Sequence, residues 1–216
     1  MPQLDDRDAP ERLPHRGRTP DEALARLKKG NADFLSDSVP PRPTDHDRRL
    51  ELALAQSPFA ILVGCSDSRV SPAHLFDAEL GELFIVRNAG NSVGEVGLGS
   101  IQFGVLELGT PLVVVLGHQR CGAVEAAVRM VEEDCTFPGS IGRMVEPIVP
   151  SVLHARKVTG ATGAELVEAS VRENVRRTVE RLRLSGPFVA LQAEGRLRIV
   201  GAEYSLDLGE VDFFLE

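Results

Sequence analysis

The chain has 216 residues, of which 43% are hydrophobic and 26% are charged, and its formal net charge at pH 7 is −8. These values are typical of one globular domain with a sizeable core, and an acidic chain without Lys/Arg blocks is a poor partner for nucleic acid. No apolar stretch approaches the ~20 residues that span a bilayer, and the first residues lack the basic start and apolar stretch of a signal peptide. We therefore expect a cytoplasmic protein that binds neither nucleic acid nor membrane.

The N-terminal region predicts an arm followed by one domain. Residues 1–18 carry prolines and many charges, which favours an arm that is mobile or lies on a partner subunit. Residues 19–216 are expected to form a single domain. Prolines at 40–43 predict a linker, and apolar residues at i, i+4 spacing predict a second helix over 45–56.

The first helix has strong start and stop signals. Thr19 is a good N-cap, Pro20 occupies the first helical position, and Glu22 completes a capping box. Gly30 is the residue at which we expect this helix to end.

From residue 58 onward, apolar strands alternate with helices. Strands are expected at 59–63, 83–86, 112–116 and 187–192, with further strands after a turn at 194–195, over 196–200 and 211–214. Helices are expected at 71–76, 97–108, 122–132, 140–156 (broken by prolines) and 164–184. Such alternation predicts an α/β fold with a mainly parallel sheet, and fully apolar strands predict helices on both faces.

Two clusters of polar residues each follow a buried strand. Residues 65–69 (Cys-Ser-Asp-Ser-Arg) come after the first strand, and residues 118–121 (His-Gln-Arg-Cys) come after the third. In parallel sheets, ligands bind beyond the carboxyl ends of the strands. If these two strands are neighbours, the clusters meet at one edge of the sheet.

Cys65, His118 and Cys121 together form a set of ligands that suits zinc, Zn²⁺. Three protein ligands leave a fourth position open, which is typical of catalytic zinc sites, where the ion lowers the pKa of bound water towards ~7. An odd number of cysteines without an export signal also favours metal or thiol chemistry over disulfides. The third cysteine, Cys135, lies in an irregular acidic stretch, and no role is assigned to it.

Asp67 and Arg69 offer two arrangements beside such a metal ion. Bonded to Arg69, the Asp67 carboxylate would accept a hydrogen bond from the zinc-bound water and orient it. Released from Arg69, Asp67 could coordinate zinc as a conditional fourth ligand and close the site. The residues alone leave both arrangements open.

Less specific interpretations also remain. The same residues could form a closed structural zinc site in a protein without turnover, or they could be unrelated core side chains. A hydrolase with a Cys–His nucleophile is a further alternative, but it would leave the second cysteine unused.

Three motifs resemble those of the β-class carbonic anhydrases. They are the Cys-Ser-Asp-Ser-Arg string at 65–69, the Gly-His-x-x-Cys-Gly string at 117–122, and Val-Arg-Asn-Ala-Gly-Asn at 86–91. The likeness extends from about Thr19 to the C-terminus. It implies a sheet of four parallel strands plus an antiparallel edge strand, with an N-terminal helical arm.

The resemblance also implies an activity, namely zinc-dependent reversible hydration of carbon dioxide to bicarbonate and a proton by a zinc-hydroxide mechanism. Cys65, His118 and Cys121 would be the zinc ligands, with Asp67 and Arg69 as the catalytic pair. Carbonyl sulfide and carbon disulfide are linear isosteres of carbon dioxide, so a hydrolase of either is the alternative within enzymes.

Further implied features concern substrate binding and assembly. Gln56 matches the family glutamine that bonds substrate, while Phe84 and Ala89 match residues of the apolar carbon dioxide pocket. The family forms homodimers with active sites at the subunit interface, and some members are dimers of dimers. Phe103 replaces a common tyrosine. Leu62 replaces the tryptophan of members with an inhibitory bicarbonate site, which argues against that regulation although Arg87 is present.

Overall fold

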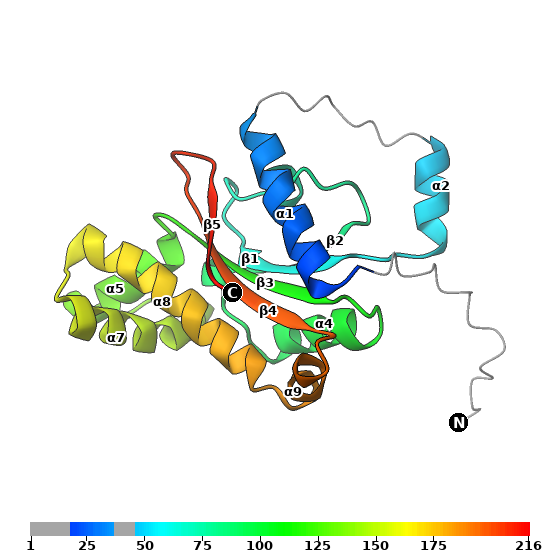
Figure 1. Cartoon of the computed structure of the whole chain (residues 1–216). Coiled ribbons are helices and arrows are strands. Elements are labelled where there is room, and N and C mark those ends of the chain that lie inside the picture. The colour runs from blue at the N-terminus through cyan, green and yellow to red at the C-terminus, as the bar shows by residue number, and fades with distance from the viewer. Residues whose placement is uncertain (1–17, 37–45) are drawn as a thin grey trace.

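The structure, a computed structural model, describes residues 18–36 and 46–216. Most of the expected arm over 1–18 and the expected linker at 40–43 lie outside the described residues. A five-stranded sheet with the order β2-β1-β3-β4-β5 forms the centre of the molecule (Figure 1). Its strands are β1 (Ala60–Cys65), β2 (Leu83–Asn88), β3 (Leu112–His118), β4 (Arg198–Tyr204) and β5 (Val211–Leu215). The first four are mutually parallel and β5 is antiparallel to β4, which confirms the predicted fold class.

The register of the parallel strands brings their carboxyl ends to one edge of the sheet. Cys65 at the end of β1 pairs with Asn88 at the end of β2. His118 at the end of β3 pairs with Tyr204 at the end of β4. Because β1 also pairs directly with β3, the two polar clusters follow neighbouring strands.

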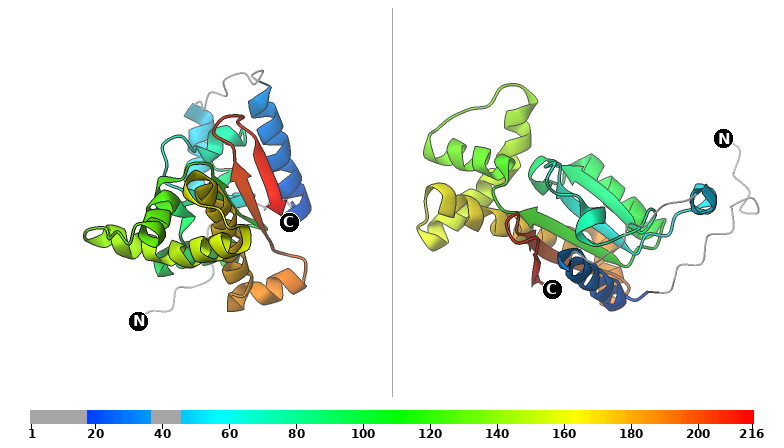
Figure 2. Two further views of the ribbon diagram at one scale, coloured as in Figure 1. Left: turned by 90° about the vertical axis from the view of Figure 1, so that its left-hand side faces the viewer. Right: turned by 90° about the horizontal axis from the view of Figure 1, so that it is seen from above.

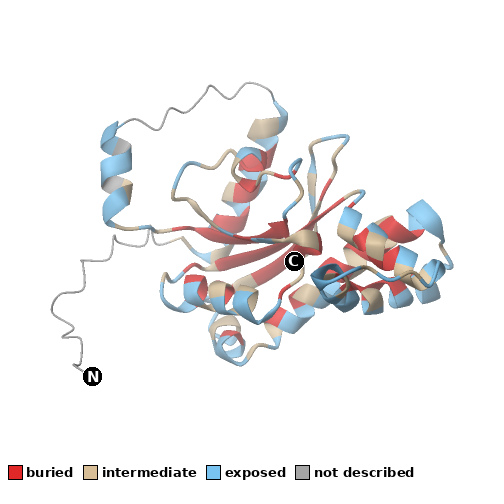
Figure 3. Ribbon diagram, turned by 180° about the vertical axis from the view of Figure 1, so that it is seen from behind, coloured by how far each residue is buried: buried red, intermediate tan, exposed pale blue. Residues whose placement is uncertain are grey.

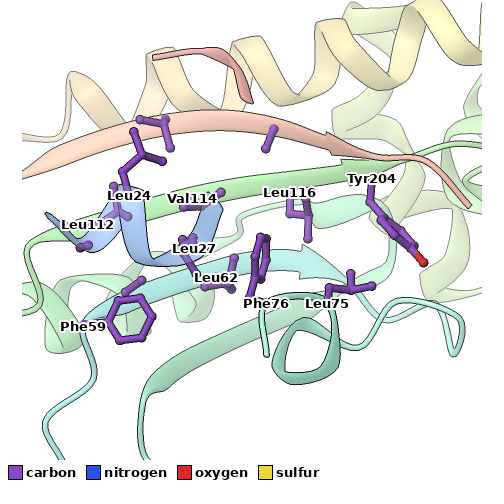
Figure 4. Close-up of a cluster of buried hydrophobic side chains, with 14 of the residues drawn as sticks. Leu24, Leu27, Phe59, Leu62, Leu75, Phe76, Leu112, Val114, Leu116 and Tyr204 are labelled. Atoms are coloured by element: carbon purple, nitrogen blue, oxygen red, sulfur yellow. The ribbon is translucent and has the colours of Figure 1, made fainter. Parts of the chain in front are cut away.

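Helices cover both faces of the sheet, because successive strand side chains point to opposite faces. On one face, α1 (Pro20–Leu35) and α3 (Pro72–Leu75) pack on Leu62, Val114 and Leu116 (Figure 4). On the other face, α4 (Glu95–Leu106) and α8 (Gly163–Arg183) pack on Ile61, Val63 and Val113. The strand residues between these helices are buried (Figure 3).

A third group of helices packs together beyond the carboxyl ends of β1 and β3 (Figures 1 and 2). It consists of α5 (Gly122–Glu132), α6 (Ser140–Val145), the short η3 (Glu146–Ile148), α7 (Val149–Thr159) and the first turns of α8. Cys65 and Cys121 belong to the apolar cluster that these helices form. The sulfur atoms of Cys65 and Cys121 are therefore enclosed by these helices on one side.

The predicted strand at 187–192 is wrong, because this segment is helix α9 (Gly186–Ala193). A short apolar run fits a buried helix as well as a strand, and Pro187 at the first turn starts a helix readily. Phe188 is fully buried against the core residues of α8 and β4. The fourth parallel strand is instead 198–204, which follows the predicted turn at 194–195.

The predicted end of the first helix at Gly30 is also wrong. Helix α1 has the predicted Thr19 capping box, but it continues to Leu35. Gly30 lies inside the helix because α1 approaches the end of α3 closely: a Cβ at this position would lie 1.9 Å from the Phe76 carbonyl oxygen. The glycine thus permits a packing contact rather than ending a helix.

The expected second helix is α2 (His46–Leu54), which lies beside the turn before β2. A Cβ on Gly81 of that turn would be 2.7 Å from Leu52. Leu50 and Leu54 are 56% and 80% exposed, so they do not reach the core of this chain. No helix within the described ranges is long and apolar enough to cross a bilayer.

Replacing Gly30 with alanine tests the close contact between α1 and α3. In an ordinary helix interior this substitution stabilises by about 1 kcal/mol. Here the added methyl group meets backbone, and we expect a loss of about 1–3 kcal/mol in the free energy of unfolding, measured by chemical denaturation. Lys29→Ala, at an exposed position in the same helix, should change that free energy by less than ~0.5 kcal/mol. A stabilised Gly30→Ala variant would contradict the contact.

Candidate metal centre

Three side chains with metal-binding atoms converge at the carboxyl edge of the sheet. Cys65 is the last residue of β1, His118 is the last residue of β3, and Cys121 precedes the first turn of α5. Their ligand atoms all lie within 4.8 Å of one another. All three side chains are buried, with exposures of 5%, 0% and 1%.

The geometry of this group suits a zinc ion. Two thiolates each ~2.3 Å from one tetrahedral zinc stand about 3.8 Å apart, and the Cys65 and Cys121 sulfurs are 3.9 Å apart. His118 Nε2 is buried and has no hydrogen-bond partner among the described residues. Its other ring nitrogen, Nδ1, lies 2.9 Å from the Gln119 carbonyl oxygen. With Nδ1 as donor to that carbonyl, Nε2 carries the lone pair that a metal ion needs.

Cys65 is the more acidic of the two thiols. Its contact with the Cys121 sulfur, together with bonds from the backbone of Gly90 and Asp67, lowers the pKa of the Cys65 thiol. The same contact with Cys65, with burial, raises the pKa of Cys121. A divalent cation bound by both sulfurs would displace the protons that these thiols carry.

Asp67 is paired with Arg69 in this structure. Arg69 Nε and Nη2 donate to the two carboxylate oxygens at 2.9 and 2.8 Å, and the Arg69 amide adds a third bond at 3.0 Å. This guanidinium holds the pKa of Asp67 well below its usual range. Asp67 Oδ2 is 3.9 Å from His118 Nε2, so the carboxylate lies beside the ligand group while bonded to Arg69.

The loop that carries His118 and Cys121 is restrained by polar contacts of Arg120 with residues of other elements. Arg120 has a positive φ of 50°, and its amide donates to Glu168 at 3.0 Å. Its guanidinium makes a two-pronged pair with Asp207 at 2.7 and 2.8 Å. The Arg120 carbonyl in turn accepts a bond of 3.4 Å from Arg69, which links the ligand loop to the Asp67–Arg69 pair.

Arg87 belongs to the 86–91 motif, but the sequence did not indicate that its guanidinium binds backbone carbonyl groups of the site. From β2 it donates to the carbonyl oxygens of Cys65 at 2.8 Å and of Asp67 at 2.7 Å. It thereby clamps the backbone between the first ligand and the carboxylate. A cationic residue near the carboxyl end of an otherwise apolar strand was the available signal.

The expected substrate-binding residues do not lie together within this chain. Ala89 directly follows β2, whose last residue pairs with Cys65, so it borders the metal centre. Gln56 lies before β1, whereas Cys65 ends it, and a strand rise of ~3.3 Å per residue separates the two ends of β1 by about 16 Å. Phe84 pairs with Ile61 near the amino end of β1 and packs on Phe103, with ring centroids 6.4 Å apart.

Comparison with known proteins identifies similar sequences and folds. Residues 60–211 match the family model described as "Carbonic anhydrase". Over 195 residues the chain is 39% identical to a carbonic anhydrase of Mycolicibacterium smegmatis, covering 89% of this chain and 92% of that protein. It is 40% identical over 193 residues to carbonic anhydrase 2 of Mycobacterium tuberculosis, covering 88% and 90% respectively.

Solved structures with the same fold include a Coccomyxa β-carbonic anhydrase in complex with acetazolamide. That chain is 26% identical, with a TM-score of 0.72 over 89% of this chain and 86% of its own. A tetrameric β-carbonic anhydrase from Sordaria macrospora has a TM-score of 0.71 at 22% identity, covering 90% of this chain and 95% of that one.

Metal binding can be tested by thermal unfolding. Zinc at about 1,000 times its Kd contributes about 4 kcal/mol, so we expect the Tm of the metal-free protein to rise by roughly 8–16 °C. Cys65→Ser should abolish this rise, because it removes one ligand. Cys135→Ser is the control, since Cys135 is only partly buried and lies outside the ligand group. An equal rise in wild type and Cys65→Ser would rule out this site.

Proposed function

The chain belongs to the β class of the carbonic anhydrase family, an enzyme family, and we propose that it catalyses the reversible hydration of carbon dioxide to bicarbonate and a proton. The observation that carries this proposal is the buried group Cys65–His118–Cys121 with the Asp67 carboxylate 3.9 Å from His118 Nε2. In that arrangement, two thiols and an imidazole that suit zinc lie beside a carboxylate that can accept a hydrogen bond from a zinc-bound water.

Cys65, His118 and Cys121 are the residues that would hold the zinc ion. A zinc ion bound by three such ligands supplies a Lewis acid that makes water nucleophilic near neutral pH. The protein excludes solvent from the sulfur side, because Cys65 and Cys121 lie in the apolar cluster of α5, α7 and α8.

Asp67 acts as the acceptor that orients the nucleophile. Arg69 keeps it ionised at all pH values near neutrality, because the pKa of Asp67 is far below its usual range. A carboxylate that is so weak a base does not remove a proton in the chemical step. It accepts a hydrogen bond from the nucleophile and thereby orients it. Arg69 and Arg87 position it by binding its carboxylate and its backbone. If Arg69 releases it, Asp67 becomes the conditional fourth ligand.

A second copy of the chain would complete the substrate pocket. Strand β2 is an edge of the sheet, and Ile85 on it is 39% exposed. On the adjacent helix α4, Phe103 and Val96 are 49% and 85% exposed. Apolar side chains gathered at a sheet edge are typical of an interface. A homodimer formed across β2, or a dimer of such dimers, would let Gln56 and Phe84 of one protomer serve the site of its partner.

Carbon dioxide hydration can be measured directly by stopped flow on the zinc-loaded protein. We expect activity that rises from neutral to mildly alkaline pH. Asp67→Asn should lower kcat/KM by roughly 10²-fold, because the amide cannot replace the charged acceptor, whereas Cys135→Ser should leave it unchanged. Absence of hydration throughout this range would contradict the proposal, and turnover of carbonyl sulfide or carbon disulfide in its place would support the hydrolase alternative.

A mixed dimer tests which protomer uses Gln56. Gln56→Ala should lower kcat/KM by roughly tenfold, the effect of one hydrogen bond, and Cys65→Ser should abolish activity. If Gln56 serves the partner, a Gln56→Ala/Cys65→Ser heterodimer has one complete site and recovers about half of the wild-type activity. If Gln56 serves its own chain, the heterodimer has one weakened site and one inactive site, and its activity is about half that of the Gln56→Ala dimer.

A further inference from the structure

Helix α8 carries an amide side chain on its buried face. Asn174 is 5% exposed and follows the apolar residues Val167 and Val171 on that face. Asparagine is a poor helix former, and a buried amide destabilises a protein unless its polar atoms are bonded. The bonds of Asn174 therefore indicate what the side chain contributes.

Both ends of the Asn174 amide have partners from other elements. Its Nδ2 donates to the Gly90 carbonyl at 3.0 Å, and its Oδ1 accepts from the Ser151 hydroxyl at 3.4 Å. Ser151 belongs to α7 and is 1% exposed. The amide thus joins α7 and α8 to the turn η2 (Ala89–Asn91), which directly follows β2.

Gly90 links this amide to the metal centre. Its own N–H donates to Cys65 Sγ at 3.3 Å. Gly90 has φ 68° and ψ 25°, and a Cβ here would lie 2.7 Å from Ile148 and 3.0 Å from Ala123. Glycine is conformationally permissive, so its N–H stays directed at the sulfur only if neighbouring groups restrain the backbone.

We propose that Asn174 is a positioning residue of the metal centre, which holds the Gly90 carbonyl so that the Gly90 N–H remains bonded to Cys65 Sγ. The inference rests on the proposed zinc site and assigns to Asn174 an influence, through Gly90, on the Cys65 ligand. Ser151 fixes the Asn174 side chain from the opposite end. The resulting chain of contacts runs from Ser151 through Asn174 and Gly90 to the Cys65 sulfur, all at buried positions.

The hydrogen bond to Cys65 affects how strongly that sulfur donates electrons to a metal. An N–H donor withdraws electron density from a thiolate, and bonds of this kind to ligands tune metal affinity and the properties of the ion. Removing the restraint on Gly90 weakens that bond. The sulfur then donates more strongly, and its charge-transfer transition to a bound metal moves to lower energy.

Cobalt(II) in place of zinc makes this change visible, because thiolate-to-cobalt charge transfer absorbs in the near ultraviolet. In Asn174→Leu, which removes the amide at similar volume, we expect this band to move to longer wavelength. We also expect the Gly90 amide to exchange hydrogen at least tenfold faster. Zinc retention against a chelator should fall by about tenfold, because the loss of ligand orientation outweighs the stronger electron donation by the sulfur. Ser151→Ala, a milder change, should shift the band in the same direction by less.

Ser170→Ala is the matched control, because Ser170 is fully buried on the same helix and its hydroxyl has no partner among the described residues. It should leave the cobalt band and the Gly90 exchange rate at their wild-type values. If Asn174→Leu does not fold, Ser151→Ala decides. A wild-type band that neither substitution moves would overturn the role of Asn174. A cobalt protein without any thiolate band would instead overturn the proposed metal centre itself.

Discussion

The parallel pairing of β1 with β3 is the constraint on which the site depends. It brings Cys65 and His118, which are 53 residues apart in the chain (118 − 65), to adjacent positions at one edge of the sheet. The turn after β3 then adds Cys121 at the start of α5. A slip of this pairing by one residue would reverse the faces of every side chain on the strand, so the apolar core and the ligand group require the same register.

Burial of two thiols and an imidazole has consequences for everything around them. Polar atoms enclosed by protein need partners, and here many of the partners are backbone groups: Gly90 for Cys65, and Gln119 for His118. Arginines then restrain the backbone itself, Arg87 at residues 65–67 and Arg69 at Arg120. The ligands are thus held by a network in which strands, turns and helices all take part, and contacts of this kind orient metal ligands.

The amino ends of strands β1 and β2, at the opposite end of the sheet from the metal centre, carry the other residues expected to bind substrate. There Phe84 of the edge strand β2 packs on Phe103 of helix α4, and Gln56 lies just before β1. These residues are too far along the strands to meet the ligands of their own chain. Their separation from Ala89 is a direct consequence of strand rise, and it is the structural reason for assigning part of the pocket to a second protomer.

The sequence by itself determined the local features. The capping box at Thr19, the apolar strands and the ligand spacing were readable because each depends on neighbours within a few residues, and the motifs at 65–69 and 117–122 already indicated the family. Tertiary packing decided the rest. Residues 187–192 are helical because Phe188 fills the core beside α8, and Gly30 lies mid-helix because α1 approaches Phe76. The contacts of Asn174 with Gly90, and of Arg87 with the Cys65 carbonyl, join residues 84 and 22 positions apart. Such bonds leave no periodic pattern in a sequence, because only the folded chain brings their partners together.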